Sequence, residues 1–138
     1  MRVRHLRIAI IATLAFVACA TSGESRLPQS ARTGSTIFVS KHYSGYEARH
    51  IGEVVRTFEK YGFVATHDRA SSHYYLDYSI NAGAVVTVKI ALLRDRQPVV
   101  EVSSTNIGWG TVIARPIAIS SRVSSALERL DALLSEGR

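Results

Sequence analysis

The chain has 138 residues, 46% of them hydrophobic, with 17 Lys and Arg against 11 Asp and Glu and a formal net charge of +6. This length fits one domain. Three of the basic residues and none of the acidic ones lie in residues 1–19, which leaves 14 basic against 11 acidic side chains in the remainder. So mild a balance, with the basic residues scattered singly, argues against a nucleic-acid partner.

Residues 1–19 have the pattern of a secretory signal. Three arginines precede an eleven-residue run, 8–18, of apolar side chains and one threonine, which Cys19 closes. A basic segment followed by a short apolar run is typical of signal peptides, and the run is shorter than the roughly 20 residues that span a bilayer as a permanent helix. The sequence therefore predicts export from a bacterial cytoplasm.

The end of this run resembles a bacterial lipobox. In Phe16-Val17-Ala18-Cys19 the chain's only cysteine follows a small residue, as in lipoproteins whose cysteine becomes the lipid-modified N-terminus, although that family prefers Leu where Phe16 stands. The resemblance implies a membrane anchor at Cys19 and, because Ala20 and not Asp follows, the outer membrane on its periplasmic side. The alternative is ordinary signal cleavage after Ala20, which would release a soluble periplasmic or secreted protein.

Residues 20–35 follow the signal and predict a flexible tether. The segment has almost no apolar side chain to bury and is rich in Ser, Thr, Gly and Pro, a composition typical of flexible linkers. Such a tether would hold a lipid-anchored domain clear of the membrane. In a cleaved, soluble protein it would be a disordered N-terminus.

The remaining chain begins with a βαβ pattern. The β-branched and aromatic run at 36–40 predicts a buried strand. Ser44 and Glu47 have the spacing of a capping box at the start of a helix, and Gly62 is suited to end it. The apolar stripe of this helix consists of Ile51, Val54, Val55 and Phe58. A second strand at 63–66 is expected to be parallel to the first or close to it.

Three further strands and a helix complete one domain, 36–138. Runs at 74–80, 85–93 and 99–103 predict an antiparallel meander, and an apolar stripe after Pro116 predicts a final helix. That stripe consists of Ile119, Val123, Leu127, Leu130 and Leu134. The order β-α-β-β-β-α predicts an α+β fold, a two-layer sandwich with a mixed sheet of about five strands and two helices on one face.

Catalytic and metal-binding patterns are weak in this sequence. The spacings among His42, His50, His67 and His73 match no metal site. His67 and Asp68, with serines close by, are the residue types of a hydrolase triad, but neighbours in a short loop do not supply its geometry. We therefore predict no catalytic residue, no metal and no cofactor, with a hydrolase using His67 or His73 as the enzymatic alternative.

Candidate partner-binding residues fall at two places. The alternation of the strand at 74–80 directs Tyr75 and Asp77 away from the core. Trp109, the only tryptophan, lies between Gly108 and Gly110, where an exposed aromatic ring would be a suitable anchor for a protein partner or a lipid interface. The alternative for Trp109 is a structural one, in which its ring covers an end of the core.

The lipobox-like start, the polar segment and the element order together resemble small bacterial envelope lipoproteins. Examples are the partner lipoprotein of the lipopolysaccharide translocon and the auxiliary lipoproteins of lipid-transport systems. The resemblance is one of topology and implies a non-enzymatic outer-membrane lipoprotein that gives a protein-binding surface to an envelope assembly or transport complex. Binding would use the open sheet face or strand addition at an edge. The alternative is a soluble periplasmic binding module or inhibitor.

Overall fold

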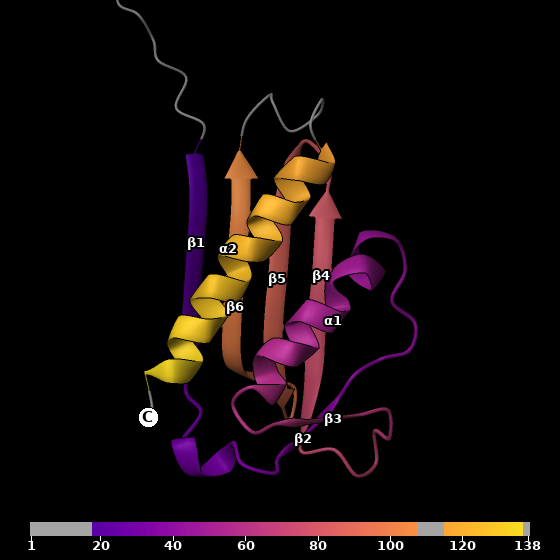
Figure 1. Ribbon diagram of the computed structural model, residues 1–138, viewed down its shortest axis with the longest axis vertical. Coiled ribbons are helices and arrows are strands. Elements are labelled where there is room, and N and C mark those ends of the chain that lie inside the picture. Colours follow the sequence, from indigo (N-terminus) through magenta and orange to yellow (C-terminus); the bar gives the residue numbers. More distant parts are fainter. Residues whose placement is uncertain (1–17, 108–114, 137–138) are drawn as a thin grey trace, which may run out of the picture.

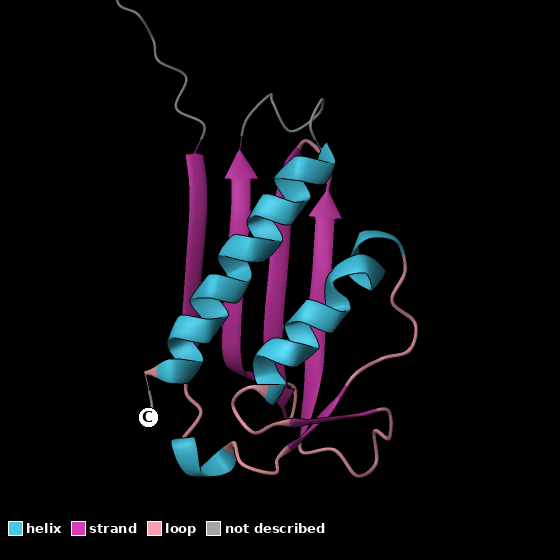
Figure 2. Ribbon diagram, in the orientation of Figure 1, coloured by secondary structure: helices cyan, strands magenta, loops and turns pink. Residues whose placement is uncertain are grey.

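The computed structural model describes residues 18–107 and 115–136, which form two layers, a mixed sheet and two α-helices on one of its faces (Figures 1 and 2). The predicted signal before residue 18 and the Trp109 loop lie outside the described residues. The elements are β1 (Ala18–Ser25), a 3-10 turn (Gln29–Ala31), β2 (Thr36–Phe38), α1 (Gly45–Glu59), β3 (Val64–Thr66), β4 (Tyr74–Ala82), β5 (Val85–Arg94), β6 (Gln97–Ile107) and α2 (Arg115–Ser135).

The α+β fold class is confirmed. From β2 onward the elements run β-α-β-β-β-β-α, which has one strand more between the helices than the predicted order β-α-β-β-β-α. Strands β2 and β3, joined by α1, are parallel neighbours, and β4, β5 and β6 form the antiparallel meander. Across the described sheet the strand order is β1-β6-β5-β4-β2-β3, so the meander occupies the middle and the βαβ unit one edge.

The prediction of a flexible tether at 20–35 is wrong. Residues 18–25 form β1, which pairs antiparallel with β6 along its whole length, so the described sheet has six strands and not about five. Beyond β1 the chain stays attached to the domain, since Leu27 and Arg32 are buried, at 7% and 5% exposure. Low hydrophobicity misled the prediction because an edge strand obtains its order from the backbone hydrogen bonds of its neighbour.

Gly23 shows why small residues suit β1. Helix α2 crosses the strand at this point, and a Cβ on Gly23 would lie 2.8 Å from Leu133 Cδ1 and 3.0 Å from Arg129 Cγ. The Arg129 guanidinium donates to the Gly23 carbonyl oxygen at 3.2 Å. The absence of a side chain therefore permits α2 to cover the sheet as far as its β1 edge.

The hydrophobic core lies between the sheet and the two helices. Its fully buried members include Val54 and Phe58 from α1, Ile119, Leu130 and Leu134 from α2, and Leu76, Val86, Val88, Ile90, Leu92, Val100 and Val102 from the meander. These positions agree with the predicted apolar stripes except at Ile51, Val55 and Leu127, which are only partly buried. The helices also meet directly, where Lys60 Nζ donates to Asp131 Oδ1 at 2.7 Å, a bond that raises the pKa of Lys60.

The predicted capping box at α1 is wrong in its contacts. Ser44 is the N-cap residue, but its side chain makes no capping hydrogen bond. Glu47 points to the sheet instead, and its Oε1 accepts from the backbone N–H of Ile80 at 3.0 Å. The reason is that β2 covers β4 only at Tyr74 and Tyr75, which leaves backbone groups farther along β4 for α1 to satisfy.

Candidate functional site

The sheet face opposite the helices is the surface on which Tyr75 and Asp77 lie, two of the predicted partner-binding residues. Register alone places Asp77 beside Ala91 and Ser79 beside Lys89 on this face, and the row continues to Ser103 of β6. In β1 the alternation brings Ser22 and Glu24 to the same face. No α-helix lies over it in the views of Figures 1 and 2.

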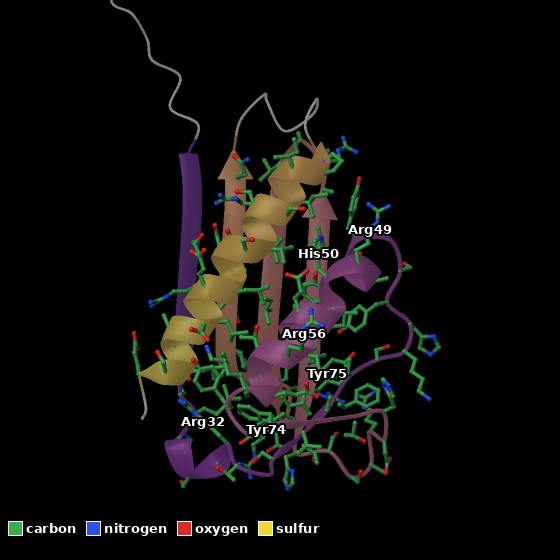
Figure 3. The ribbon with its side chains drawn as sticks, in the orientation of Figure 1. Arg32, Arg49, His50, Arg56, Tyr74 and Tyr75 are labelled. Carbon is green, nitrogen blue, oxygen red and sulfur yellow. The ribbon has the colours of Figure 1, made fainter. Side chains whose placement is uncertain are left out.

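Tyr75 belongs to an aromatic group with a cation above it. Its ring stacks on that of Phe38, with 5.5 Å between the ring centroids and 26° between the planes. The Arg69 guanidinium carbon lies 5.2 Å from the Tyr75 ring centroid and 6.0 Å from that of Phe38. We call Phe38, Arg69 and Tyr75 the Tyr75 cluster; Figure 3 shows Tyr75 near the end of the sheet at which β4 begins.

This cluster borders a hollow that charged side chains enter. His73, Asp95 and Arg96 line the hollow with Arg69 and Tyr75. Asp95 and Arg96 form the turn between β5 and β6, both at positive φ, 52° and 65°, the conformation of a tight two-residue hairpin. Stacked aromatic rings with charged side chains beside them are suited to contact with a protein surface.

Asp77 lies farther along β4 on the same face and forms an ion pair with Lys89. Lys89 Nζ lies 3.4 Å from Asp77 Oδ2, and both side chains are about two-fifths exposed, at 40% and 41%. An exposed pair of this kind stabilises the fold by at most about 1 kcal/mol. Both groups are therefore accessible to a partner that brings its own charges.

The β1 side of the face carries acidic residues. Glu24 lies directly opposite Glu101 in the β1–β6 register, an unfavourable juxtaposition of like charges. Arg26 compensates from the end of β1, with Nε 2.9 Å from Glu24 Oε1. A shallow hollow lined by these three residues, together with Ser22 and Ser103, crosses β1 and β6.

Two tyrosines between α1 and β4 are held in the neutral form. The Tyr43 hydroxyl donates to the Leu76 carbonyl oxygen at 3.4 Å, and its ring lies 5.7 Å from that of Tyr78. Burial, assisted by the nearby Tyr75 and Asp77, raises the pKa of Tyr43 to about 12. Burial likewise raises the pKa of Tyr78.

The histidines serve the local structure. His67 Nδ1 lies 2.7 Å from the Val39 carbonyl oxygen. His73 Nδ1 lies 3.0 Å from the backbone nitrogen of Thr36 and 2.8 Å from its hydroxyl. Asp68 Oδ1 accepts from the Ala70 backbone N–H at 3.0 Å. Within residues 18–107 and 115–136, no three His, Cys, Asp or Glu side chains are placed to hold a metal ion.

The backbone of Cys19 lies in β1. Its register partner in β6 is Asn106, so the residue lies near one end of the sheet. Tyr75 lies at the start of β4, which is at the opposite end of the sheet. Cys19 and Tyr75 are thus not brought together. Among the described helices, none is long and apolar enough to cross a membrane.

Sequence reasoning missed Phe38 and Arg69 as companions of Tyr75. Strand alternation contained a usable signal for Phe38, since Ile37 and Val39 are buried and the residue between them must face the opposite way. No signal indicated Arg69, because its position depends on the path of the loop between β3 and β4.

Comparison with known proteins gave structural likenesses only. No family model matches the chain, and no curated protein matches it. Two solved structures of the PelC dodecamer from Paraburkholderia phytofirmans are similar to it, each at 16% sequence identity. The first, a point variant, has a TM-score of 0.45 and the alignment covers 83% of this chain and 98% of that chain. The second has a TM-score of 0.44, with 86% and 96% covered.

Proposed function

We propose that this protein is a non-enzymatic lipoprotein of the outer membrane that faces the periplasm and gives a protein-binding surface to an envelope assembly. One observation carries the anchor. The apolar run ends at Ala18, which is also the first residue of β1. Cleavage before Cys19 would therefore remove the signal and keep Cys19 to Ser25 paired with β6.

The partner surface in this proposal is the uncovered sheet face, centred on the Tyr75 cluster. Tyrosine and arginine are among the residue types that contribute most to binding at protein interfaces. Stacking holds the rings of Phe38 and Tyr75 in place before any partner arrives, so little side-chain entropy is lost on binding. Strand addition at the outer edge of β1 is the second way in which a partner could join this sheet.

The geometry around the histidines supports a binding role over a hydrolase. The Nδ1 atoms of His67 and His73 are engaged by Val39 and Thr36, and the Asp68 carboxylate is engaged by Ala70. A catalytic triad needs the carboxylate to orient the imidazole toward a nucleophile, and these contacts direct both groups elsewhere.

The anchor is tested by the intact mass of the protein purified from the membranes of its native host. A mass that begins at Cys19 and includes acyl chains supports the proposal, and Cys19→Ser should then move the protein to the soluble fraction. A mass that begins at Thr21 without lipid would overturn the anchor and favour the soluble binding module.

The partner surface is tested by photo-crosslinking in the same cells. A photoreactive residue replaces Ser79, which is exposed on the uncovered face, and in a matched strain it replaces Ser120, which is exposed on α2. We expect a discrete crosslinked envelope protein from the first strain alone. Arg69→Ala should then weaken binding of that partner at least about tenfold, as loss of an interface hot spot does, and Arg56→Ala on α1 should leave it unchanged.

A further inference from the structure

One end of the domain gathers the start of β1, the hairpin between β4 and β5, the end of β6 and the start of α2 (Figure 1, upper end). The register makes this explicit, since Ala18 and Val85 both pair with Ile107, one on each side of β6. Cys19 lies in the next row, paired with Asn106. We call residues 18–21, 81–87, 104–107 and 115–119 the Cys19 end.

Exposed apolar side chains concentrate at this end. Val64, Val85 and Ile117 are the large hydrophobic residues that are exposed among the described residues, at 50%, 39% and 73%. Val85 begins β5 and Ile117 lies in the first turn of α2, so two of the three belong to the Cys19 end although they come from different elements. Val64, at the start of β3, lies at the far end of the sheet.

Charged side chains are also distributed unequally between the two ends of the domain. Among the described residues of the Cys19 end, Arg115 carries the only charge and no carboxylate occurs. The opposite end carries Asp68, Arg69, Arg94, Asp95 and Arg96. An apolar surface with a basic residue and no acidic one is suited to an anionic lipid surface, where a carboxylate would be repelled and expensive to desolvate.

The backbone of Cys19 lies close to that of Val85 across the sheet. Adjacent strands are about 4.8 Å apart, so the two steps from β1 to β5 amount to roughly 10 Å. No flexible segment separates Cys19 from the sheet, because Cys19 is itself paired within it. The headgroup layer of one leaflet is about 5 to 8 Å deep, so an acyl chain at Cys19 would bring the whole end to that layer.

We propose that the Cys19 end docks on the bilayer, with Val85 and Ile117 in the headgroup layer and the opposite end directed away from the membrane. This inference rests on the proposed lipid anchor at Cys19. The strands of the sheet then point away from the membrane surface. The Tyr75 cluster, at the far end of the sheet, faces the aqueous compartment. The occupant of the surface is the lipid bilayer itself.

The test measures how fast a water-soluble maleimide reacts with single cysteines at the two ends. Val85→Cys, Ile117→Cys and Val64→Cys are made in the acylated protein, whose Cys19 thiol is blocked by lipid, after its intact mass has confirmed acylation. Each is reconstituted in phosphatidylethanolamine and phosphatidylglycerol vesicles. The reference for each site is its unanchored counterpart carrying Cys19→Ser, and circular dichroism confirms that all variants fold.

Docking predicts that anchoring slows the reaction at residues 85 and 117 by about fivefold or more, as expected for side chains buried at the lipid interface, and leaves residue 64 unchanged. Equal rates with and without the anchor at residues 85 and 117 would overturn the docking and leave lipidation intact. Slowing at all three sites would overturn the orientation. A protein that carries no lipid would fail at the mass measurement, which is the failure of the proposed function and not of the docking alone.

Discussion

The Glu47 carboxylate accepts a hydrogen bond from the backbone N–H of Ile80 at 3.0 Å, which fastens α1 to an edge of β4 that β2 does not cover. Hydrogen bonds to charged groups contribute about 1.5 to 3 kcal/mol. We expect Glu47→Ala to lower the free energy of unfolding by about 2 kcal/mol. Urea denaturation measures this change.

The matched control for Glu47 is Glu59→Ala in the last turn of the same helix. Glu59 is exposed, and a carboxylate near a helix C-terminus is mildly unfavourable. Its removal should leave stability unchanged or slightly raised. Equal losses of stability from Glu47→Ala and Glu59→Ala would show that the hydrogen bond to Ile80 does not account for the effect of Glu47→Ala.

A side chain at Gly23 is expected to overpack the contact between β1 and α2. A methyl group there would meet Leu133 and Arg129 of α2 at 2.8 and 3.0 Å, so Gly23→Ala should destabilise the domain by about 1 to 3 kcal/mol. Gly52→Ala is the control, since its methyl group would find only Arg56 Nη1, at 3.6 Å. Because Gly52 lies within α1, that change should stabilise the helix by about 0.5 to 1 kcal/mol. Thermal unfolding of both variants would reveal opposite signs if the packing is as described.

Removal of the charged side chain of Arg32 is expected to lower the stability of the domain strongly. Arg32 is buried, and its Nη1 donates to the carbonyl oxygen of Leu134 in the last turn of α2, where a cation is favoured by the helix dipole. Arg32→Ala should cost about 2 to 4 kcal/mol, because it leaves the Leu134 carbonyl unsatisfied and opens a cavity. Arg26→Ala, whose side chain is exposed, should change stability by less than about 0.5 kcal/mol. Similar losses in the two variants would contradict this assignment.

The raised pKa of Tyr43 predicts that the stability of the fold falls at alkaline pH. This pKa is raised to about 12 in the folded protein, against about 10 in the unfolded chain. Between these values the unfolded state has fewer bound protons than the folded state, so stability is full below pH 10 and is lost as pH rises toward 12. Tyr43→Phe removes this proton release.

The measurement for Tyr43 compares denaturant unfolding at about pH 9 and about pH 11. Tyr43→Phe should reduce the loss of stability between the two conditions by about 1 kcal/mol, a figure lowered by the partial exposure of the ring to water. Identical losses in the variant and the parent protein would assign the alkaline sensitivity to other groups, such as Tyr78, whose pKa is also raised by burial.

The sequence predicts most of this fold because its core elements have strong periodicities. Val54 and Phe58 of the α1 stripe are buried, and so are the alternating Tyr74, Leu76 and Tyr78 of β4. What it could not predict depends on partners distant in sequence. Strand β1 is ordered by β6, and Glu47 responds to an uncovered edge of β4, so neither leaves a local pattern.

The candidate site was predicted to a similar extent. Alternation placed Tyr75 and Asp77 on the uncovered face correctly, since the rule is local. The stack of Tyr75 on Phe38 requires the parallel pairing of β2 with β4, and the position of Arg69 requires the path of a loop. Neither follows from residue spacing.

The pairing of β1 with β6 also determines when the sheet can be completed. Thr21 and Ser104, whose hydroxyls are 2.9 Å apart, are separated by 83 residues in the chain, and contacts so distant in sequence form late because of the entropy of closing the loop. If the chain crosses a membrane N-terminus first, β1 emerges early and then waits unpaired until β6 has followed. A lipid attached to Cys19 would therefore secure the protein to its membrane before the domain behind it has finished folding.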